Sequence, residues 1–346
     1  MSRSATTRLA LALAAGALAV VLAVALSSAV GAQPISLSAA LAGRDPDAAI
    51  LLSLRLPRAV LAALVGCALA AAGTALQALL RNPLAEPFVL GVSGGAALGG
   101  SIVLVAAAGV ARVAGGAGVA LGGAPPVALG AVAGAAASTV LVFGLGRIAG
   151  RLVPEAALLV GIVFNAFVAG VITIMKILVP AEEASRLTYW LVGAIGYEGP
   201  GTLATGALFV ALSVGLLIAL SARLNLLTLG DDDAAALGVD VRRVRALVFL
   251  GASVATGAAV ALAGVIGFVG LIVPHLLRRV VGPDHRLLVP ASALFGAVFL
   301  VLADALARLA FLPLGTEPPV GAVTAFLGGP FFLWLLRRRA RPQDAA

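Results

Sequence analysis

The sequence predicts an all-α integral membrane protein with about ten membrane-spanning helices. Of its 346 residues, 62% are hydrophobic and 11% are charged, and the mean hydropathy is +1.14. Soluble globular chains carry about 25% charged residues, so this composition excludes a soluble enzyme, a disordered protein and a fibrous one. Because a spanning helix needs about 20 apolar residues, the chain has enough apolar sequence for about ten. Its 42 glycines favour helices that approach one another closely in lipid.

The first apolar stretch covers residues 9–32 and follows Arg3 and Arg8. It resembles a signal peptide, but it is longer than the usual apolar region of about 7–15 residues. We therefore expect a retained first helix rather than cleavage. Further uncharged runs of spanning length lie at 59–80, 88–110, 125–146, 156–175, 200–222, 246–277, 287–303 and 318–336.

The run at 246–277 decides the number of spans. Arginines flank it on both sides, and basic residues mark cytoplasmic ends. The run is therefore predicted to be a hairpin of two short helices that breaks near 263–267. This gives ten spans with both termini cytoplasmic, and sixteen of the 23 lysine and arginine residues then face the cytoplasm. The net charge of +8 is explained by these loops, so no nucleic acid partner is expected.

We interpret residues 1–346 as one transmembrane domain with a cytoplasmic loop at 223–245 and a glycine-rich outside loop at 109–123. The single cysteine, Cys67, excludes an internal disulfide. The chain has one lysine, Lys176, and no G-x-x-x-x-G-K-[ST] loop to hold phosphates. H-E-x-x-H, G-x-S-x-G and C-x-x-C are also absent from the sequence. We therefore expect no catalytic residue, no metal ligand and no cofactor on this chain.

These absences favour a pore or a permease driven by another protein. The main alternative is a secondary transporter driven by an ion gradient, which predicts several carboxylates buried in the spans. Such residues are scarce here.

Two motifs form the candidate gate and translocation path. Prolines after the second span break the helix in a turn formed by Asn82, Pro83, Leu84 and Ala85, where the asparagine side chain can bond freed backbone groups. Small residues then recur on one predicted helix face, as a packing surface or as a smooth wall beside a substrate path. The residues on this face are Gly91, Gly95 and Gly99, four apart. The candidate path residues of this motif are Gly91, Ser93 and Gly95, and the mid-span amide of Asn165 joins them.

Of the seven lysine and arginine residues predicted outside, three are candidate functional residues at the ends of spans: Arg55, Arg58 and Arg308. In one interpretation these side chains only extend along the apolar surface to reach water, and Arg308 forms an ion pair with Asp304 one helical turn earlier. The other is a docking site for an acidic partner. Spacing alone leaves both open.

The longest cytoplasmic loop contains a predicted short surface helix. An aspartate can cap its start, three alanines propagate it, and a glycine can end it. Magnesium binding by the aspartates, as in a membrane prenyl transferase, would need a second acidic cluster that the cytoplasmic loops lack. The candidate residues are Leu229, Gly230, Asp231, Asp232, Asp233, Ala235, Leu237 and Gly238.

Taken in order, the motifs from 55 to 336 resemble the permease family of type II ABC importers for vitamin B12 (cobalamin), haem and ferric siderophores. One departure is Glu317-Pro-Pro-Val-Gly, where the family more often has leucine or isoleucine before the second proline. The matching motifs are R-L-P-R at 55–58, R-N-P-L-A-E-P at 81–87, G-V-S-x-G-A at 91–96, Y-W-x-x-G at 189–193, L-G-x(6)-L-G at 229–238, A-G-x-I-G-F-x-G-L-x-x-P-H at 263–275, D-H-R at 284–286, A-D-x-x-A-R at 303–308, P-V-G-x-x-T at 319–324 and G-x-P-F-F at 328–332.

This resemblance implies a homodimer in the bacterial inner membrane, two separate ATPase subunits that carry ATP and Mg²⁺, and a periplasmic substrate-binding protein. It implies that the three outside arginines meet glutamates of the binding protein and that the helix at 229–238 couples to the ATPase. The turn at 82–85 and the segment at 152–156 would form the cytoplasmic gate. Haem or a ferric siderophore is the first expected cargo, since iron-chelate permeases often read G-x-x-x-N-A around the position of Asn165, and cobalamin is the second.

Overall fold

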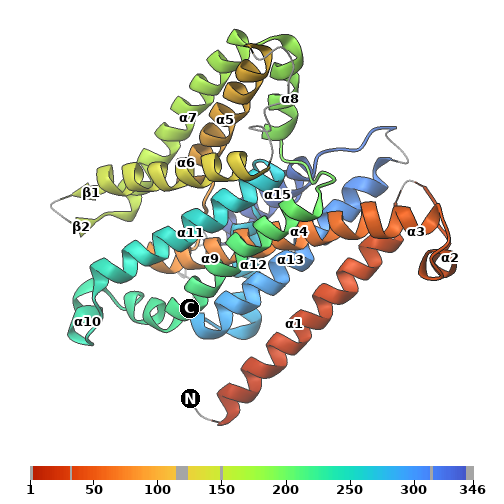
Figure 1. The fold of residues 1–346 in the computed structure, drawn as a ribbon. Coiled ribbons are helices and arrows are strands. Elements are labelled where there is room, and N and C mark those ends of the chain that lie inside the picture. The colour runs from red at the N-terminus through yellow and green to blue at the C-terminus, as the bar shows by residue number, and fades with distance from the viewer. Residues whose placement is uncertain (1–2, 32, 114–123, 149–150, 312–314, 340–346) are drawn as a thin grey trace.

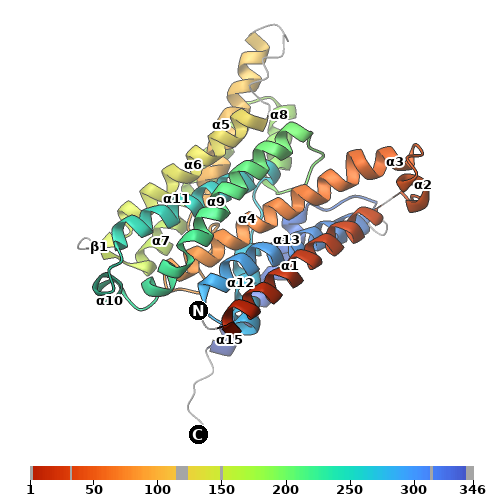
Figure 2. The ribbon, with the colours of Figure 1, turned by 60° about the horizontal axis from the view of Figure 1, so that its bottom comes forward.

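A computed structural model describes residues 3–31, 33–113, 124–148, 151–311 and 315–339, and these form a bundle of helices with one very short hairpin of strands (Figures 1 and 2). The predicted helical membrane protein is confirmed. The elements are α1 (Arg3–Ala29), α2 (Leu37–Leu41), α3 (Asp47–Ala49), the π-helical turn η1 (Ile50–Arg55), α4 (Leu56–Leu79), α5 (Val92–Val113), α6 (Ala124–Leu145), β1 (Arg147–Ile148), β2 (Arg151–Leu152), α7 (Pro154–Leu178), α8 (Ala181–Leu191), α9 (Pro200–Leu227), α10 (Asp231–Ala236), α11 (Val241–Ala263), α12 (Val269–Val281), α13 (His285–Leu309) and α15 (Val320–Arg339).

Eight helices in the described part of the chain are long and apolar enough to cross a membrane. The run at 246–277 breaks at residues 264–268, as predicted, but the two helices are unequal. The first of them, α11, has 23 residues and is long enough to span, whereas α12 has 13. The expectation of two short helices is therefore wrong for α11. Most of the predicted outside loop at 109–123 lies outside the described residues.

The central element is α4, the orange helix that crosses the middle of Figure 1. It packs against α13, α11, α9, α12 and α1. Glycines allow this crowding, because a Cβ on Gly66 would lie 2.1 Å from the carbonyl oxygen of Gly296. A Cβ on Gly73 would lie 2.2 Å from the carbonyl oxygen of Gly270. At these two crossings the helix backbones are in direct contact, as small residues permit in membrane bundles.

Glycines also set the contact between α5 and α6. A Cβ on Gly95 would lie 2.4 Å from the Gly134 carbonyl oxygen, and one on Gly99 would lie 2.0 Å from that of Gly130. The predicted packing face is therefore present at these two residues. Gly91 does not belong to it, because this residue precedes α5 and has a φ of +78°. Its positive φ turns the chain into the helix.

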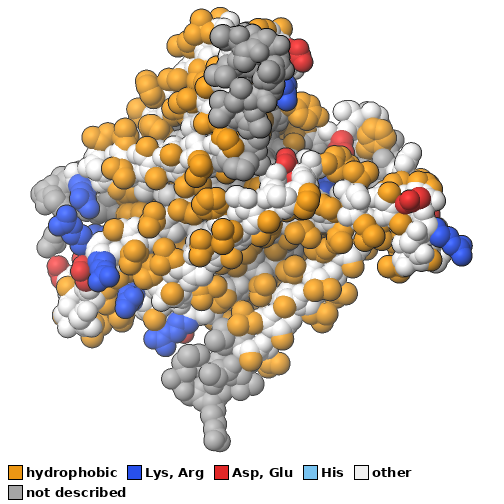
Figure 3. Space-filling view, in the orientation of Figure 1, with side chains coloured by type: hydrophobic (Ala, Val, Ile, Leu, Met, Phe, Trp, Pro, Cys, Tyr) orange, Lys and Arg blue, Asp and Glu red, His pale blue; other side chains and the backbone are white. Residues whose placement is uncertain are grey.

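The surface between the two ends of the bundle is largely apolar (Figure 3). Lysine and arginine side chains gather at the end that carries β1, β2 and α10. Large exposed apolar side chains, such as Val140, Phe167 and Ile177, cover the helices between the ends. This arrangement is that of a protein whose middle faces lipid and whose ends face water.

Candidate functional sites

The first candidate site is an arginine cluster at the end of the bundle opposite α10. Asp304 is fully buried and lies between Arg58 and Arg308. The Arg58 Nη2 donates to Asp304 Oδ1 at 2.8 Å, and the Arg308 Nε donates to Oδ2 at 3.1 Å. Arg58 also pairs with the half-exposed Glu317 and lies over the Tyr197 ring at 5.5 Å. The predicted ion pair between Arg308 and Asp304 is confirmed.

The same cluster donates hydrogen bonds to the carbonyl oxygens at the C-terminal end of α1. Arg55 Nη1 donates to the carbonyl oxygens of Ser28 at 3.3 Å and Ala29 at 3.1 Å, and Arg308 Nη1 donates to that of Val30 at 2.7 Å. Cationic side chains satisfy the free carbonyls at a helix C-terminus and favour its dipole.

The three arginines are therefore not free surface cations, since each is less than 8% exposed. They instead line a cavity of about 210 Å³. Whether this cavity receives a partner stays a prediction. Its lining is Gly31, Gln33, Ile50, Leu54, Arg55, Arg58, Tyr197, Arg308 and Glu317.

The second candidate site is α10 with its flanking residues. Gly230, at φ +136°, occupies the N-cap, so the expected aspartate cap is wrong and all three aspartates lie in the first turn. There they favour the helix dipole. Gly238, at φ +82°, follows the helix end as expected. Leu229 and Leu237 are each 60% exposed and flank α10 with apolar surface.

Asp231 connects this helix to α11 and to the turn after α4. It accepts a hydrogen bond from Arg245 Nη2 of α11 at 2.7 Å and lies 3.6 Å from Arg81 Nη2. Arg81 has a φ of +48° and immediately precedes the predicted gate turn. The surface helix and the turn after α4 are therefore in direct electrostatic contact.

The turn itself has the expected geometry. Asn82 Oδ1 accepts from the Leu84 N–H at 2.9 Å, and the Ala85 N–H donates to the Asn82 carbonyl at 3.0 Å. Pro83 lines a cavity of about 500 Å³. Of the second predicted gate segment, Leu152 belongs to β2 and α7 already begins at Pro154, so this connection is shorter than expected.

The remaining predicted path residues pack inside the chain. Ser93 is buried, and Gly95 contacts α6. Asn165 Nδ2 donates to the Phe88 carbonyl at 2.7 Å. A Cβ on Gly94 would lie 2.2 Å from Asn165 Oδ1. Asn165 thus fixes the entry to α5 against α7.

Sequence reasoning missed Glu86, which is buried in the same turn. Burial raises the pKa of its carboxyl from 4.5 to about 7, against the opposing effect of a hydrogen bond from the Phe268 backbone. Phe268 has a φ of +69° and is the N-cap of α12. The sequence did contain a signal for it, because Glu86 is an acidic residue between Pro83 and Pro87 and next to apolar predicted helices.

Comparison with known proteins connects these features. A family model described as the FecCD transport family matches residues 17–338. The chain belongs to this family. It is 39% identical over 297 residues to the hemin transport system permease protein HmuU of Yersinia pestis, which covers 84% of each chain. It is 43% identical over 287 residues to the cobalamin import system permease protein BtuC of Halobacterium salinarum, covering 83% of this chain and 73% of that protein.

The fold is similar to a solved structure of a metal-chelate type ABC transporter in an inward-facing conformation. The TM-score is 0.79 at 28% identity, over 95% of this chain and 99% of the other. As a FecCD family member the chain is a multi-pass membrane permease of an ABC importer, and the ATPase is a separate subunit. Family membership excludes the ion-gradient-driven alternative.

The buried carboxylate of Asp304 should be essential for stability. Asp304→Ala removes the buried carboxylate that the two buried arginines share, so we expect a loss of about 3–5 kcal/mol in the free energy of unfolding. Unfolding in mild detergent measures it. The control is Glu155→Ala, which removes an exposed carboxylate from α7. An equally small change in both variants would contradict a structural role for the cluster.

Glu86 predicts a pH-dependent stability. Its raised pKa means that the neutral carboxyl stabilises the fold, fully below about pH 4.5, and that this contribution disappears as the pH rises through about 7. The change is roughly 3 kcal/mol. We expect Glu86→Gln to gain several degrees in melting temperature over the natural protein at pH 8 and little at pH 5. A pH-independent difference would show that the carboxyl does not titrate in this range.

Proposed function

We propose that this permease moves a metal chelate into the cytoplasm, with haem or a ferric siderophore as the first candidate and cobalamin as the second. The hemin permease relative and the metal-chelate transporter structure support this cargo class. The cobalamin permease relative keeps the second candidate open. The chain acts as a homodimer with two ATPase subunits and a substrate-binding protein.

The proposed topology is one domain of ten crossing segments with both termini cytoplasmic. It counts α12 and α15 in addition to the eight long helices. The arginine-rich end of the bundle supports the orientation (Figure 3). The start of α1 and the end of α15 both lie near the end that carries α10 (Figure 2), as an even number of crossings requires.

The contact between Asp231 and Arg81 carries the coupling proposal. ATPase subunits dock on α10 through the exposed Leu229 and Leu237. A displacement of α10 is passed to the Asn82–Ala85 turn through Arg81 and to α11 through Arg245. Nucleotide on the ATPase thereby biases two arrangements of the gate.

Docking of the binding protein uses the arginine-lined cavity at the opposite end. Its three arginines favour a carboxylate. Glu317 already pairs with Arg58 there and its side chain is 36% exposed, so water reaches this pair. A glutamate of the binding protein replaces Glu317 on Arg58 in this proposal. The buried Asp304 stays in place and keeps the arginines oriented.

Uptake assays test the proposed function. The chain is purified with its ATPase from native membranes and reconstituted in vesicles with the binding protein. Hemin, a ferric siderophore and cobalamin are offered separately, with and without ATP. We expect ATP-dependent accumulation of an iron chelate. Accumulation of cobalamin alone would overturn the cargo ranking, and uptake without ATP would overturn the ATP-driven mechanism.

The coupling contact has its own prediction. Asp231→Asn weakens the pairs with Arg81 and Arg245, so we expect about a two- to fivefold drop in cargo moved per ATP hydrolysed, with ATPase assembly intact. Asp233→Asn is the matched control, because it removes the same charge from α10 without breaking either pair. Equal effects of the two variants would refute transmission through Asp231.

A further inference from the structure

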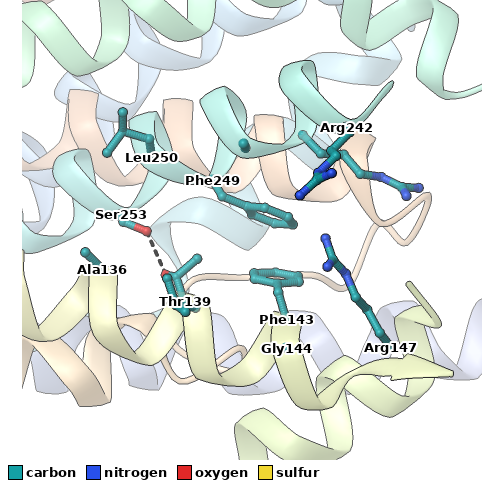
Figure 4. A pocket seen from close by; sticks show the side chains of 12 residues that line it. Ala136, Thr139, Phe143, Gly144, Arg147, Arg242, Phe249, Leu250 and Ser253 are labelled. Atoms are coloured by element: carbon teal, nitrogen blue, oxygen red, sulfur yellow. Dashed lines mark hydrogen bonds between the residues drawn. The ribbon is translucent and has the colours of Figure 1, made fainter. Parts of the chain in front are cut away.

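A second cavity, of about 450 Å³, lies between α6 and α11 and contains none of the proposed docking or gate residues (Figure 4). It touches the proposed coupling system only through Arg245. Its lining is Ala136, Thr139, Val140, Phe143, Gly144, Arg147, Arg242, Arg245, Ala246, Phe249, Leu250 and Ser253.

The inner part of this cavity is apolar. The rings of Phe143 and Phe249 are stacked with centroids 3.5 Å apart. Thr139 and Ser253 are hydrogen-bonded to each other at 2.6 Å, shown by the dashed line in Figure 4, so their hydroxyls need no further partner. An apolar occupant suits such a wall, because a polar one would lose its own hydrogen bonds there.

The mouth of the cavity is cationic. Arg147 approaches it from β1, just after α6, and Arg242 from the start of α11 (Figure 4). Within the described part of the chain, neither of these two forms an ion pair. Arg245 lies deeper and pairs with Asp231. Guanidinium groups at this position favour a phosphate, which accepts bidentate hydrogen bonds.

The length of the cavity matches one leaflet of a bilayer. On α11 its lining runs from Ser253 back to Arg242, and on the facing side it runs from Ala136 to Gly144 of α6 and on to Arg147 of β1. At about 1.5 Å per residue the α11 stretch covers roughly 16 Å. A bilayer core is about 30 Å thick, so this is close to half. The exposed side chains of Val140 and Leu250 place the cavity on a lipid-facing surface.

We propose that this cavity binds an anionic phospholipid from the leaflet at the arginine-rich end. Its phosphate lies between Arg147 and Arg242, and one acyl chain runs along Phe143, Phe249 and Leu250. Gly144 leaves room for this chain, because a Cβ there would meet nothing within 4 Å. The bound lipid fills the gap between α6 and α11 beside Arg245, which holds α10 through Asp231.

Retained lipid on the purified full-length permease tests the proposal by native mass spectrometry. Phosphatidylglycerol and phosphatidylcholine with identical acyl chains are compared. We expect preferential retention of phosphatidylglycerol. Arg147→Gln and Arg242→Gln should each reduce that retention about fivefold. Arg243→Gln, which removes an exposed charge beside the cavity without lining it, should leave retention unchanged.

The second test is a substitution that fills the cavity with a side chain. Gly144→Leu places a side chain in the space of the acyl chain and should lower phosphatidylglycerol retention at least tenfold. Gly215→Leu is the matched control on α9, where a Cβ also meets nothing within 4 Å. Normal retention by Gly144→Leu would show that the chain does not enter this cavity.

Three further outcomes would overturn the proposal. Equal retention of the two lipids would show that the arginines do not select an anionic headgroup. Binding of glycerol 3-phosphate as tight as that of the lipid would show a site for a soluble anion. Loss of the lipid on assembly with the ATPase would show that a protein covers this face in the complex.

Discussion

The direct contact of helix backbones around α4 is the constraint on which the rest of the structure depends. Gly66 and Gly73 bring α13 and the start of α12 against the central helix with no side chain between them. Lipid tails supply little hydrophobic drive for helix association, so close packing and buried hydrogen bonds must hold the bundle together. The direction of α4 in turn fixes where its two ends lie, and both candidate functional regions are at those ends.

The two ends use charge in different ways. At one end Arg58 and Arg308 enclose Asp304, out of water, and the arginines satisfy the last carbonyls of α1. At the other end the partly exposed Asp231 has two arginine partners, one in the turn after α4 and one in α11. A buried cluster of this kind resists rearrangement, because separation would leave charges unpaired. The exposed pairs cost little to rearrange, which suits the moving end of a transporter.

The sequence was sufficient for most of the fold. Hydropathy and arginine positions predict the long helices and the break after Ala263, because bilayer thickness and backbone satisfaction leave few alternatives. The sequence was insufficient where a tertiary contact decides the burial or the partner of a residue. Arg58 and Asp304 are far apart in the chain, and so are the buried Glu86 and the Phe268 backbone to which it is hydrogen-bonded. Sequence spacing therefore revealed neither contact. The prediction that an aspartate caps α10 was wrong, because the N-cap residue, Gly230, adopts a backbone conformation that favours glycine over aspartate.

The shortness of α12 has a consequence for biogenesis. Thirteen residues extend only about 20 Å, and an isolated segment of that length falls below the roughly 18 apolar residues that mark an independent membrane helix. Its lateral entry into lipid during synthesis therefore depends on α11, which precedes it and is long enough to be recognised alone. The two helices must leave the insertion machinery as one unit, so a mutation that weakens α11 as a membrane segment would misplace everything that follows it in the chain.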